Sequence, residues 1–227
     1  MISNMNEWTY DGYLDMIDMA MANDNDLYLR HDVDISIDKA LQMAELESTR
    51  QFHSTYFILL SSPFYNALEA HNLEKIRMIR SLGMGIGLHY DLSINEQSLD
   101  MHVKEIIVQL GLMINHVGPI DAVTFHKPML GQAPTTKLFQ ELFKEGVFSP
   151  THADHHYISD SGHNWRENFV ETIQENKKIH MNTHPEWYND EAQSYEECLD
   201  GLKLDKSADK LIQVEKRSIR EYQKRLV

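Results

Sequence analysis

The fold is decided by the stretch Leu27-Tyr28-Leu29-Arg30-His31-Asp32-Val33-Asp34. Its apolar start predicts a buried strand over residues 27–32, and charged residues follow where that strand ends. Apolar residues then recur at helical spacing from Ile37 to Ala44, with Ser36 placed to cap the helix. A strand that leads directly into a helix predicts a strand–helix–strand unit, from which parallel α/β folds are assembled.

The same alternation of short apolar runs with helical periodicity repeats along the chain. It predicts further strands at residues 54–59, 84–89, 121–126, 147–148, 157–159 and 178–182. Polar residues at the carboxyl ends of several strands favour a barrel with its active site at that rim. No glycine-rich phosphate loop follows the first strand, so a nucleotide-binding domain lacks its main support. We therefore expect one α/β domain over residues 1–227, with about seven strands.

The composition describes a globular protein with an acidic surface. The 227 residues are 42% hydrophobic, enough for one sizeable core, and the formal net charge is −14. Such a charge repels phosphate backbones, so we expect no nucleic-acid partner. The single cysteine, Cys198, cannot form an internal disulfide, and no apolar run is long enough to span a bilayer. Because the N-terminus shows no signal-peptide pattern, the expected location is the cytoplasm.

Two carboxylates mark the end of the first strand. Residues two apart along a strand point to the same side, so Asp32 and Asp34 should converge while Val33 faces away. Paired carboxylates repel each other unless a cation or a proton lies between them. Taken alone, the pair fits a helix-capping aspartate beside a surface aspartate equally well.

Polar residues also end the strands that follow. His89 and Asp91 share one face of the third strand, although a lone histidine there is more often an ordinary hydrogen-bonding residue. The remaining groups are His126-Lys127-Pro128, Asp160-Ser161-Gly162 with Trp165, and Thr183-His184-Pro185-Glu186-Trp187. Carboxylate oxygens together with imidazole nitrogens suit zinc or a similar divalent ion.

Taken in order, these motifs resemble those of the polysaccharide deacetylase family, the NodB homology group. The resemblance covers about residues 27–188 and rests on Leu29-Arg30-His31-Asp32-Val33-Asp34, Gly85-Ile86-Gly87-Leu88-His89-Tyr90-Asp91, Phe125-His126-Lys127-Pro128, Asp160-Ser161-Gly162 with Trp165, and Thr183-His184-Pro185. It implies a distorted (β/α) barrel of roughly seven strands. It also implies one divalent metal and hydrolysis of an N-acetyl or O-acetyl group on a sugar.

The resemblance further implies roles for single residues. Asp32 is the expected catalytic base, His184 is the general acid, and Asp160 orients that histidine. Asp34 and His89 are the expected metal ligands. The expected substrate-binding residues, with the two tryptophans as pocket walls, are Tyr90, Lys127, Trp165 and Trp187.

One departure from the family pattern affects the metal site. Typical members carry a second histidine four residues after the first, and that position here is Ser93. His126 stands where many members have an arginine, and it is our first choice as the third ligand, with orientation of Asp32 as its alternative role. Asp91 and the histidines of residues 152–156 are the other candidate ligands. The expected ion is Zn²⁺, with Fe, Co, Ni and Mn as alternatives.

Together these expectations describe a metal-dependent carbohydrate deacetylase. Its expected partner is a nucleotide-linked or lipid-linked amino sugar or glycan intermediate of surface-polysaccharide or O-antigen biosynthesis, and no oligomeric state is predicted. Two alternatives stay open. One is a non-catalytic carbohydrate-binding or regulatory protein on the same fold, and the other is an amidohydrolase acting on a C–N bond outside sugars.

Overall fold

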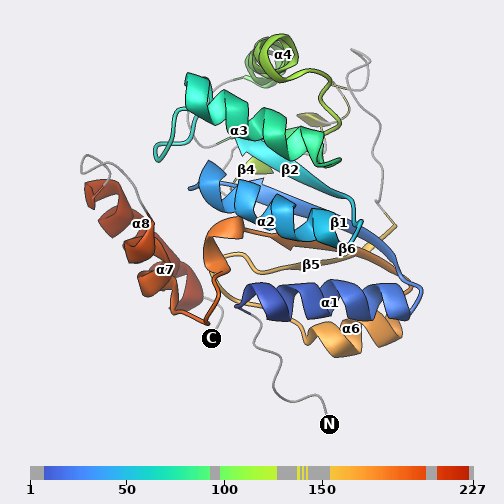
Figure 1. Cartoon of the computed structure of the whole chain (residues 1–227). Coiled ribbons are helices and arrows are strands. Elements are labelled where there is room, and N and C mark those ends of the chain that lie inside the picture. The colour runs from blue at the N-terminus through green and yellow to red at the C-terminus, as the bar shows by residue number, and fades with distance from the viewer. Residues whose placement is uncertain are drawn as a thin grey trace.

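The computed structural model describes residues 8–92, 98–126, 137–138, 140, 142, 154–202 and 209–224. The described part of the chain contains a curled sheet of six parallel strands, in the order β4-β3-β2-β1-β6-β5 (Figure 1). The strands are β1 (Asp26–Val33), β2 (Ser54–Leu59), β3 (Gly85–Asp91), β4 (Val123–His126), β5 (His156–Ser159) and β6 (Lys178–Thr183). Strand β1 therefore lies inside the sheet, paired with β2 on one side and β6 on the other.

Helices pack against this sheet (Figure 1). They are α1 (Tyr10–Ala22), α2 (Ile37–Thr49), α3 (Ala70–Ser81), α4 (Leu99–Val117), α6 (Phe169–Glu175), α7 (Tyr195–Gly201) and α8 (Asp209–Lys224), with a 3-10 turn, η1 (Pro185–Trp187). Helices α1 to α4 follow one another across the sheet, α6 lies beside α1, and α7 and α8 pair at the left of the view (Figure 1). Buried apolar side chains from the strands and these helices form one hydrophobic cluster.

The start of α2 fixes the chain directly after the first motif. The Oγ atom of Ser36 accepts a hydrogen bond from the backbone N–H of Lys39 at 3.2 Å, which confirms the predicted cap. Val33 and Ile35 on either side of Asp34 are buried. Asp34 is therefore held between a buried strand and a capped helix, at the carboxyl edge of the sheet.

Gly87 allows β3 to pack closely against its neighbours. A Cβ atom at this position would lie 2.3 Å from the ring of Phe57 on β2 and 3.1 Å from the carbonyl oxygen of Ala122. Real Cβ atoms do not make the first contact, and the second is tighter than most, so glycine is favoured here. This close packing places His89, two residues further along β3, between the end of β2 and β4.

The predicted parallel α/β architecture is confirmed, but the predicted count of seven strands is not. Six predicted strands are present, residues 54–59 with the predicted ends and the other five with shifted ends, whereas the strand predicted at residues 147–148 lies outside the described residues. Among the helices that the structure describes, none is long and apolar enough to cross a membrane. The single domain over residues 1–227 and the cytoplasmic location stay predictions.

Candidate metal centre and active site

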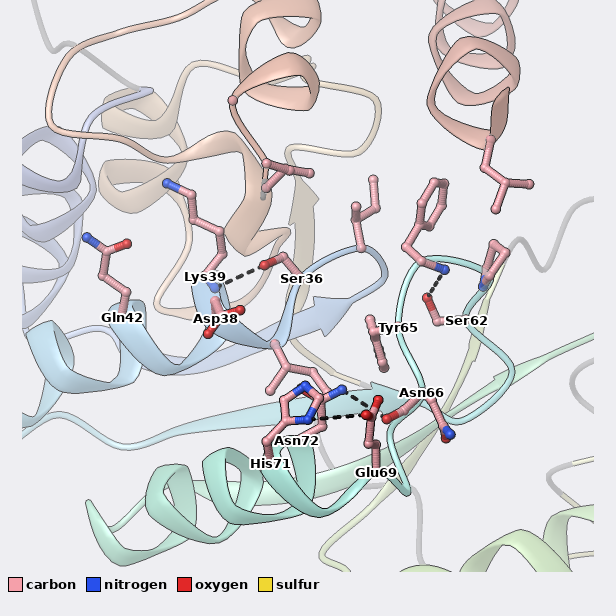
Figure 2. A pocket seen from close by; sticks show the side chains of 17 residues that line it. Ser36, Asp38, Lys39, Gln42, Ser62, Tyr65, Asn66, Glu69, His71 and Asn72 are labelled. Carbon is pink, nitrogen blue, oxygen red and sulfur yellow. Dashed lines mark hydrogen bonds and ion pairs between the residues drawn. The ribbon is translucent and has the colours of Figure 1, made fainter. Parts of the chain in front are cut away.

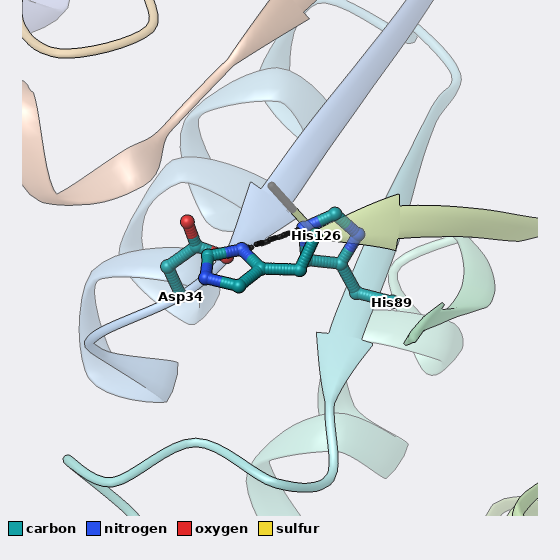
Figure 3. A group of neighbouring side chains, drawn as sticks. All are labelled: Asp34, His89 and His126. Carbon is teal, nitrogen blue, oxygen red and sulfur yellow. Dashed lines mark hydrogen bonds and ion pairs between the residues drawn. The ribbon is translucent and has the colours of Figure 1, made fainter. Parts of the chain in front are cut away.

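Asp34, His89 and His126 meet at the carboxyl edge of the sheet (Figure 3). Asp34 follows β1, His89 lies near the end of β3, and His126 ends β4. The Oδ1 atom of Asp34 lies 3.4 Å from Nε2 of His89 and 3.2 Å from Nδ1 of His126. These two ring nitrogens are 3.2 Å apart. The structure thus brings together Asp34 and His89, the two predicted ligands, and His126, the first choice for the third ligand.

The three side chains fit a divalent ion such as zinc. Ligand atoms about 2.0–2.1 Å from a tetrahedral zinc ion are about 3.3 Å from one another, which matches the separations in this group. The Oδ1 atom of Asp34 is also buried without a hydrogen bond. A buried carboxylate oxygen in that state is costly unless a cation neutralises it. Both the spacing and the unpaired oxygen therefore indicate a metal centre.

Thr124 orients His89 within this centre. Its Oγ1 atom lies 2.7 Å from Nδ1 of His89, so the other ring nitrogen, Nε2, faces the group. Burial lowers the pKa of His89 to about 4, although the carboxylates of Asp32 and Asp34 act in the opposite direction. At neutral pH the ring is therefore neutral, which is the form that binds a metal.

Asp34 itself is ionised. Burial alone would raise the pKa of this carboxyl group, but the neighbouring rings of His126 and His89 outweigh that effect and lower it. A deprotonated carboxylate beside a neutral imidazole is the state that metal coordination requires.

Asp32 lies beside the metal group. Hydrogen bonds hold one of its carboxylate oxygens, and the other oxygen has no hydrogen-bond partner. Its Oδ2 atom accepts hydrogen bonds from Nη2 of Arg30 at 2.8 Å and from Nδ2 of Asn182 at 3.1 Å. The same oxygen is 3.7 Å from Nε2 of His89. Its Oδ1 atom is buried and has no hydrogen-bond partner. Burial raises the pKa of Asp32, but the charge of Arg30 outweighs this effect and lowers the pKa, so the group is a carboxylate with one oxygen that has no hydrogen-bond partner.

His184 faces the same group from the end of β6. Its Nδ1 atom lies 2.6 Å from Oδ1 of Asp160, whose other oxygen accepts hydrogen bonds from the His184 backbone N–H and the Tyr188 hydroxyl. Its Nε2 atom is 4.0 Å from Oδ2 of Asp34. Burial opposes the charge on His184, but the pair with Asp160 raises the pKa well above the ordinary value. The ring is therefore protonated at neutral pH and can give up a proton from Nε2.

The structure adds residues that the sequence analysis did not assign. Arg30, Asn182, Thr124 and Tyr188 hold Asp32, His89 or Asp160 in place. Arg30 lies two residues before Asp32 on β1, and Asn182 lies on β6 two residues before His184, which directly follows that strand. The alternation of side chains along a strand could therefore have pointed to both residues.

Glu186 is a further acidic group near the general-acid candidate. Its side chain is buried, and its Oε2 atom has no hydrogen-bond partner. Burial raises the pKa of Glu186 well above its ordinary value, and the charge of Asp34 adds to this effect while His184 opposes it. Burial therefore favours the neutral form of Glu186.

Not every predicted substrate-binding residue lies in this group. The Tyr90 hydroxyl donates to Glu105 of α4 at 2.8 Å and lies 3.0 Å from Nδ1 of His102. Strand alternation thus directs Tyr90 away from the side that carries His89, and we leave it out of the proposed substrate pocket. Lys127 lies outside the described residues.

The two predicted pocket walls belong to an aromatic cluster near η1. The ring of Trp165 is 6.4 Å from that of Trp8, which stacks on His163 at 3.9 Å. His163 in turn contacts Trp187 at 5.5 Å between ring centroids. Both tryptophan Nε1 atoms are buried without a hydrogen-bond partner. Their role as walls of a substrate pocket stays a prediction.

The other candidate metal ligands are placed differently. Asp91 is not part of the ligand group, which contains Asp34, His89 and His126. His155 contacts Asp26 at the start of β1, and His156 pairs with Glu167 at 2.7 Å. Both histidines therefore lie at the amino ends of the strands, opposite the metal group. His152 lies outside the described residues.

A second polar cluster lies behind β1. Glu47 of α2 is fully buried and accepts hydrogen bonds from Ser54 at 2.6 Å, Tyr56 at 2.8 Å and the Tyr13 hydroxyl. His31 links this carboxylate, at 2.8 Å from its Nε2, to the Thr183 hydroxyl, at 2.6 Å from its Nδ1. We call this the rear cluster, made of Tyr13, His31, Glu47, Ser54, Tyr56 and Thr183. The front cluster comprises Asp32, Asp34, His89, His126 and His184.

The curled parallel sheet is similar to that of a solved protein of the CE4 (polysaccharide deacetylase) family. A solved structure that it resembles is a mutant of BA3943, described as a CE4 family pseudoenzyme with restored enzymatic activity. The TM-score is 0.52 at 10% sequence identity, over 88% of this chain and 64% of that one. The chain therefore spans less than two thirds of that protein, and at this identity the likeness shows the fold alone.

A second structure is the wild-type BA3943 of Bacillus anthracis, described as a CE4 family pseudoenzyme. Its TM-score is 0.46 at 10% identity, over 87% of this chain and 61% of that one. No protein-family model and no curated protein matches the sequence.

Proposed function

We propose that the protein is a metal-dependent hydrolase that removes an acetyl or other acyl group from an amino sugar or glycan. One observation carries the proposal. Asp32 and the protonated His184 both border the metal-type group of Asp34, His89 and His126, and the buried Oδ1 of Asp32 has no hydrogen-bond partner. Amide hydrolysis needs a base that takes a proton from water and an acid that protonates the leaving nitrogen, and this arrangement supplies both.

Asp34, His89 and His126 would hold the metal, for which we propose Zn²⁺. When bound, such an ion polarises an acyl carbonyl and lowers the pKa of water. The ligand states support this assignment, because Asp34 is ionised and the buried ring of His89 is neutral.

Asp32 would be the base, acting through Oδ1. Arg30 and Asn182 hold its Oδ2 atom, so the carboxylate cannot rotate without losing two hydrogen bonds. As water attacks the acyl carbon, Oδ1 takes its proton. The Arg30 charge keeps the resting carboxylate deprotonated, which is the form that a base needs.

His184 would be the acid. Its Nε2 proton passes to the leaving amine nitrogen as the C–N bond breaks, while Nδ1 remains hydrogen-bonded to Asp160. The products are the carboxylic acid and the free amino sugar. A second proton transfer, from Asp32 back to His184, restores the starting state.

Two other functions were considered on the same fold. A non-catalytic carbohydrate-binding protein would not need an ionised carboxylate oxygen left without a partner at the centre of the site, as Asp32 has here. An amidohydrolase acting outside sugars would use the same groups, so substrate screening separates it. We propose surface-polysaccharide or O-antigen assembly as the setting, on the resemblance of the motifs.

The test is replacement of the base. We expect Asp32→Asn to lower acetate release from N-acetyl sugars by at least about 100-fold, because proton transfer by one positioned group contributes that much. Elemental analysis should show unchanged zinc content, since Asp32 is not among the ligands. Retained activity of Asp32→Asn would overturn the assignment of Asp32 as the base. Wild-type protein that binds no metal and releases no acetate would support a non-catalytic carbohydrate-binding protein. Activity on cyclic amides alone would support the amidohydrolase.

A further inference from the structure

A pocket of about 1090 Å³ lies between α2, α3 and the α7–α8 pair (Figure 2). No residue of the front cluster is among its described lining residues. Ser62 in the lining donates its hydroxyl to the carbonyl oxygen of Asp34 at 2.7 Å, and the Lys39 ammonium donates to three oxygen atoms. These polar groups are already paired within the protein, whereas the outer side of α4 has no cover.

Helix α4 is apolar on two sides. Its inner side packs on β3 and α3 and is buried. Its outer side, at the top of the view in Figure 1, carries five large apolar side chains that are between 39% and 61% exposed, namely Met101, Ile107, Val108, Leu112 and Ile114. None of the other described helices carries more than two exposed side chains of this kind. Since a helix that is apolar all round is normally buried, the outer side of α4 lacks a partner.

The exposed residues of α4 form one continuous face. Residues 107, 111 and 114 follow one another at the i, i+4, i+7 spacing, and residues 108, 112 and 115 repeat this spacing one position further on. None of these six exposed residues is charged. We call them the α4 face, made of Ile107, Val108, Gly111, Leu112, Ile114 and Asn115.

Gly111 lies at the centre of the α4 face. Outside its own helix backbone, a Cβ atom at this position would meet no atom within 4 Å, so packing within the chain does not require a glycine. Glycine inside a helix also lowers stability relative to alanine. On an exposed face, however, a glycine lets the backbone of a second helix approach closely, because the distance between packed helices depends on the side chains at the contact.

The α4 face is nearly symmetric about Gly111. In an antiparallel pair of α4 helices with a twofold axis at Gly111, Val108 of each copy faces Ile114 of the other. The same axis sets Lys104 near Gly118, the C-cap of the other helix, where a positive charge is favourable. A contact between two identical copies needs a self-complementary surface of this kind.

The charges of the chain disfavour other occupants of the α4 face. Helices that lie on membranes carry cationic side chains beside their apolar stripe. Lys104 is the only lysine or arginine of α4, and it pairs with Asp100 at 2.6 Å. The net charge of −14 also repels anionic lipids. A second copy brings the same uncharged apolar face and needs no opposite charge.

We propose that the α4 face is the contact of a twofold-symmetric homodimer, in which two α4 helices cross at Gly111. The proposal is independent of the proposed function, because no residue of the front cluster lies on α4.

The oligomeric state of the full chain tests the dimer, measured by sedimentation equilibrium. We expect wild-type protein to dimerise and Val108→Glu to weaken the dimer by at least about 100-fold, because the contact would bury an unpaired charge. Val214→Glu is the matched control, since Val214 is also exposed but lies on α8, and it should leave the dimer unchanged. Added salt should strengthen the wild-type dimer, because it screens the repulsion between two acidic chains. A monomeric wild type, equal losses in the two variants, or a dimer that salt weakens overturns the proposal.

Gly111→Cys tests the crossing point and does not rely on a weakened dimer. Two cysteines at position 111 meet on the twofold axis, so mild oxidation should link most of the protein into covalent dimers on a denaturing gel. The native Cys198 is buried and should not react. Val214→Cys is the control and should stay unlinked. Equal linking of the two variants overturns the crossing at Gly111, and a monomeric wild type that binds phosphatidylcholine vesicles would assign the α4 face to a membrane instead.

Discussion

The front and rear clusters lie on opposite sides of one strand, β1. Each combines carboxylate with imidazole groups and is largely buried, but only the rear cluster also contains hydroxyl side chains. In the rear cluster Glu47 receives four contacts from hydroxyl and ring donors, and both nitrogens of His31 are engaged. In the front cluster one oxygen of Asp32 and one of Asp34 have no hydrogen-bond partner.

This difference separates a polar group that supports the fold from one that is arranged for a ligand. A buried polar network that satisfies all of its own atoms fixes the elements that carry it, and here those elements are α1, α2, β1, β2 and β6. A buried polar group with free atoms costs stability, so its persistence indicates a missing cation or substrate. The alternation of β1 directs His31 to the first kind of group and Asp32 to the second.

The largest expected effect concerns the rear cluster. Glu47→Gln removes the charge that pairs with buried His31 and replaces acceptor lone pairs with an N–H₂ group facing hydroxyl donors. We expect the free energy of unfolding to fall by about 3–5 kcal/mol. Chemical denaturation checks this, with Glu45→Gln as the control on the exposed side of α2, where a change within about 0.5 kcal/mol is expected. If the Glu47→Gln protein were as stable as that control, the rear cluster would not be a network that stabilises the fold.

The next effect concerns the front cluster. Asp34→Asn should weaken zinc binding by more than about 100-fold, because loss of a ligand exceeds the 10–100-fold that loss of a ligand's supporting partner costs. The free energy of unfolding of the metal-free protein should stay the same or rise, because Asp34→Asn removes a buried charge that nothing neutralises in the absence of the metal. Chelator competition and denaturation measure the two quantities. A variant that loses stability and keeps its zinc affinity would place Asp34 in the same structural category as Glu47.

A smaller effect on zinc affinity is expected from Thr124, which supports His89 of the front cluster. Thr124→Val removes the contact that holds Nδ1 of His89, and we expect zinc affinity to fall about 10–100-fold. Thr124→Ser keeps the hydroxyl and should restore most of that affinity. If the serine and valine variants behaved alike, the hydroxyl would not be what orients the ring.

The smallest effect is the change of charge in the front cluster near neutral pH. In the metal-free protein His89 should titrate at about 4 and His184 well above its ordinary value of 6.5. The lowered pKa of His89 removes stability as the pH falls from about 6.5 towards 4, because the unfolded chain then binds a proton that the folded chain does not. The raised pKa of His184 stabilises below 6.5 and loses that effect as the pH rises through the folded value. Histidine NMR titration checks both, and two rings that titrate together near 6.5 would contradict the environments described here.

The two-residue periodicity of the strands was sufficient to predict most strands of the sheet and part of the site. The two-residue rule placed Asp32 and Asp34 together, and the same rule applied to Tyr90 would have directed it away from His89. The third ligand was left open because it depends on the pairing of β3 with β4, which sets His126 opposite Asp91. No local pattern fixes that pairing. Glu47 was missed because its partners come from three other elements, α1, β1 and β2.

The most direct test of the metal centre is a crystal structure of the zinc-loaded protein with anomalous scattering measured at the zinc edge. We expect one strong peak bonded to Oδ1 of Asp34, Nε2 of His89 and Nδ1 of His126, with Oδ1 of Asp32 facing it and not bonded to it. An ion held by Asp91 or by the histidines at the amino ends of the strands would overturn this ligand assignment. So would protein that binds no zinc in this group.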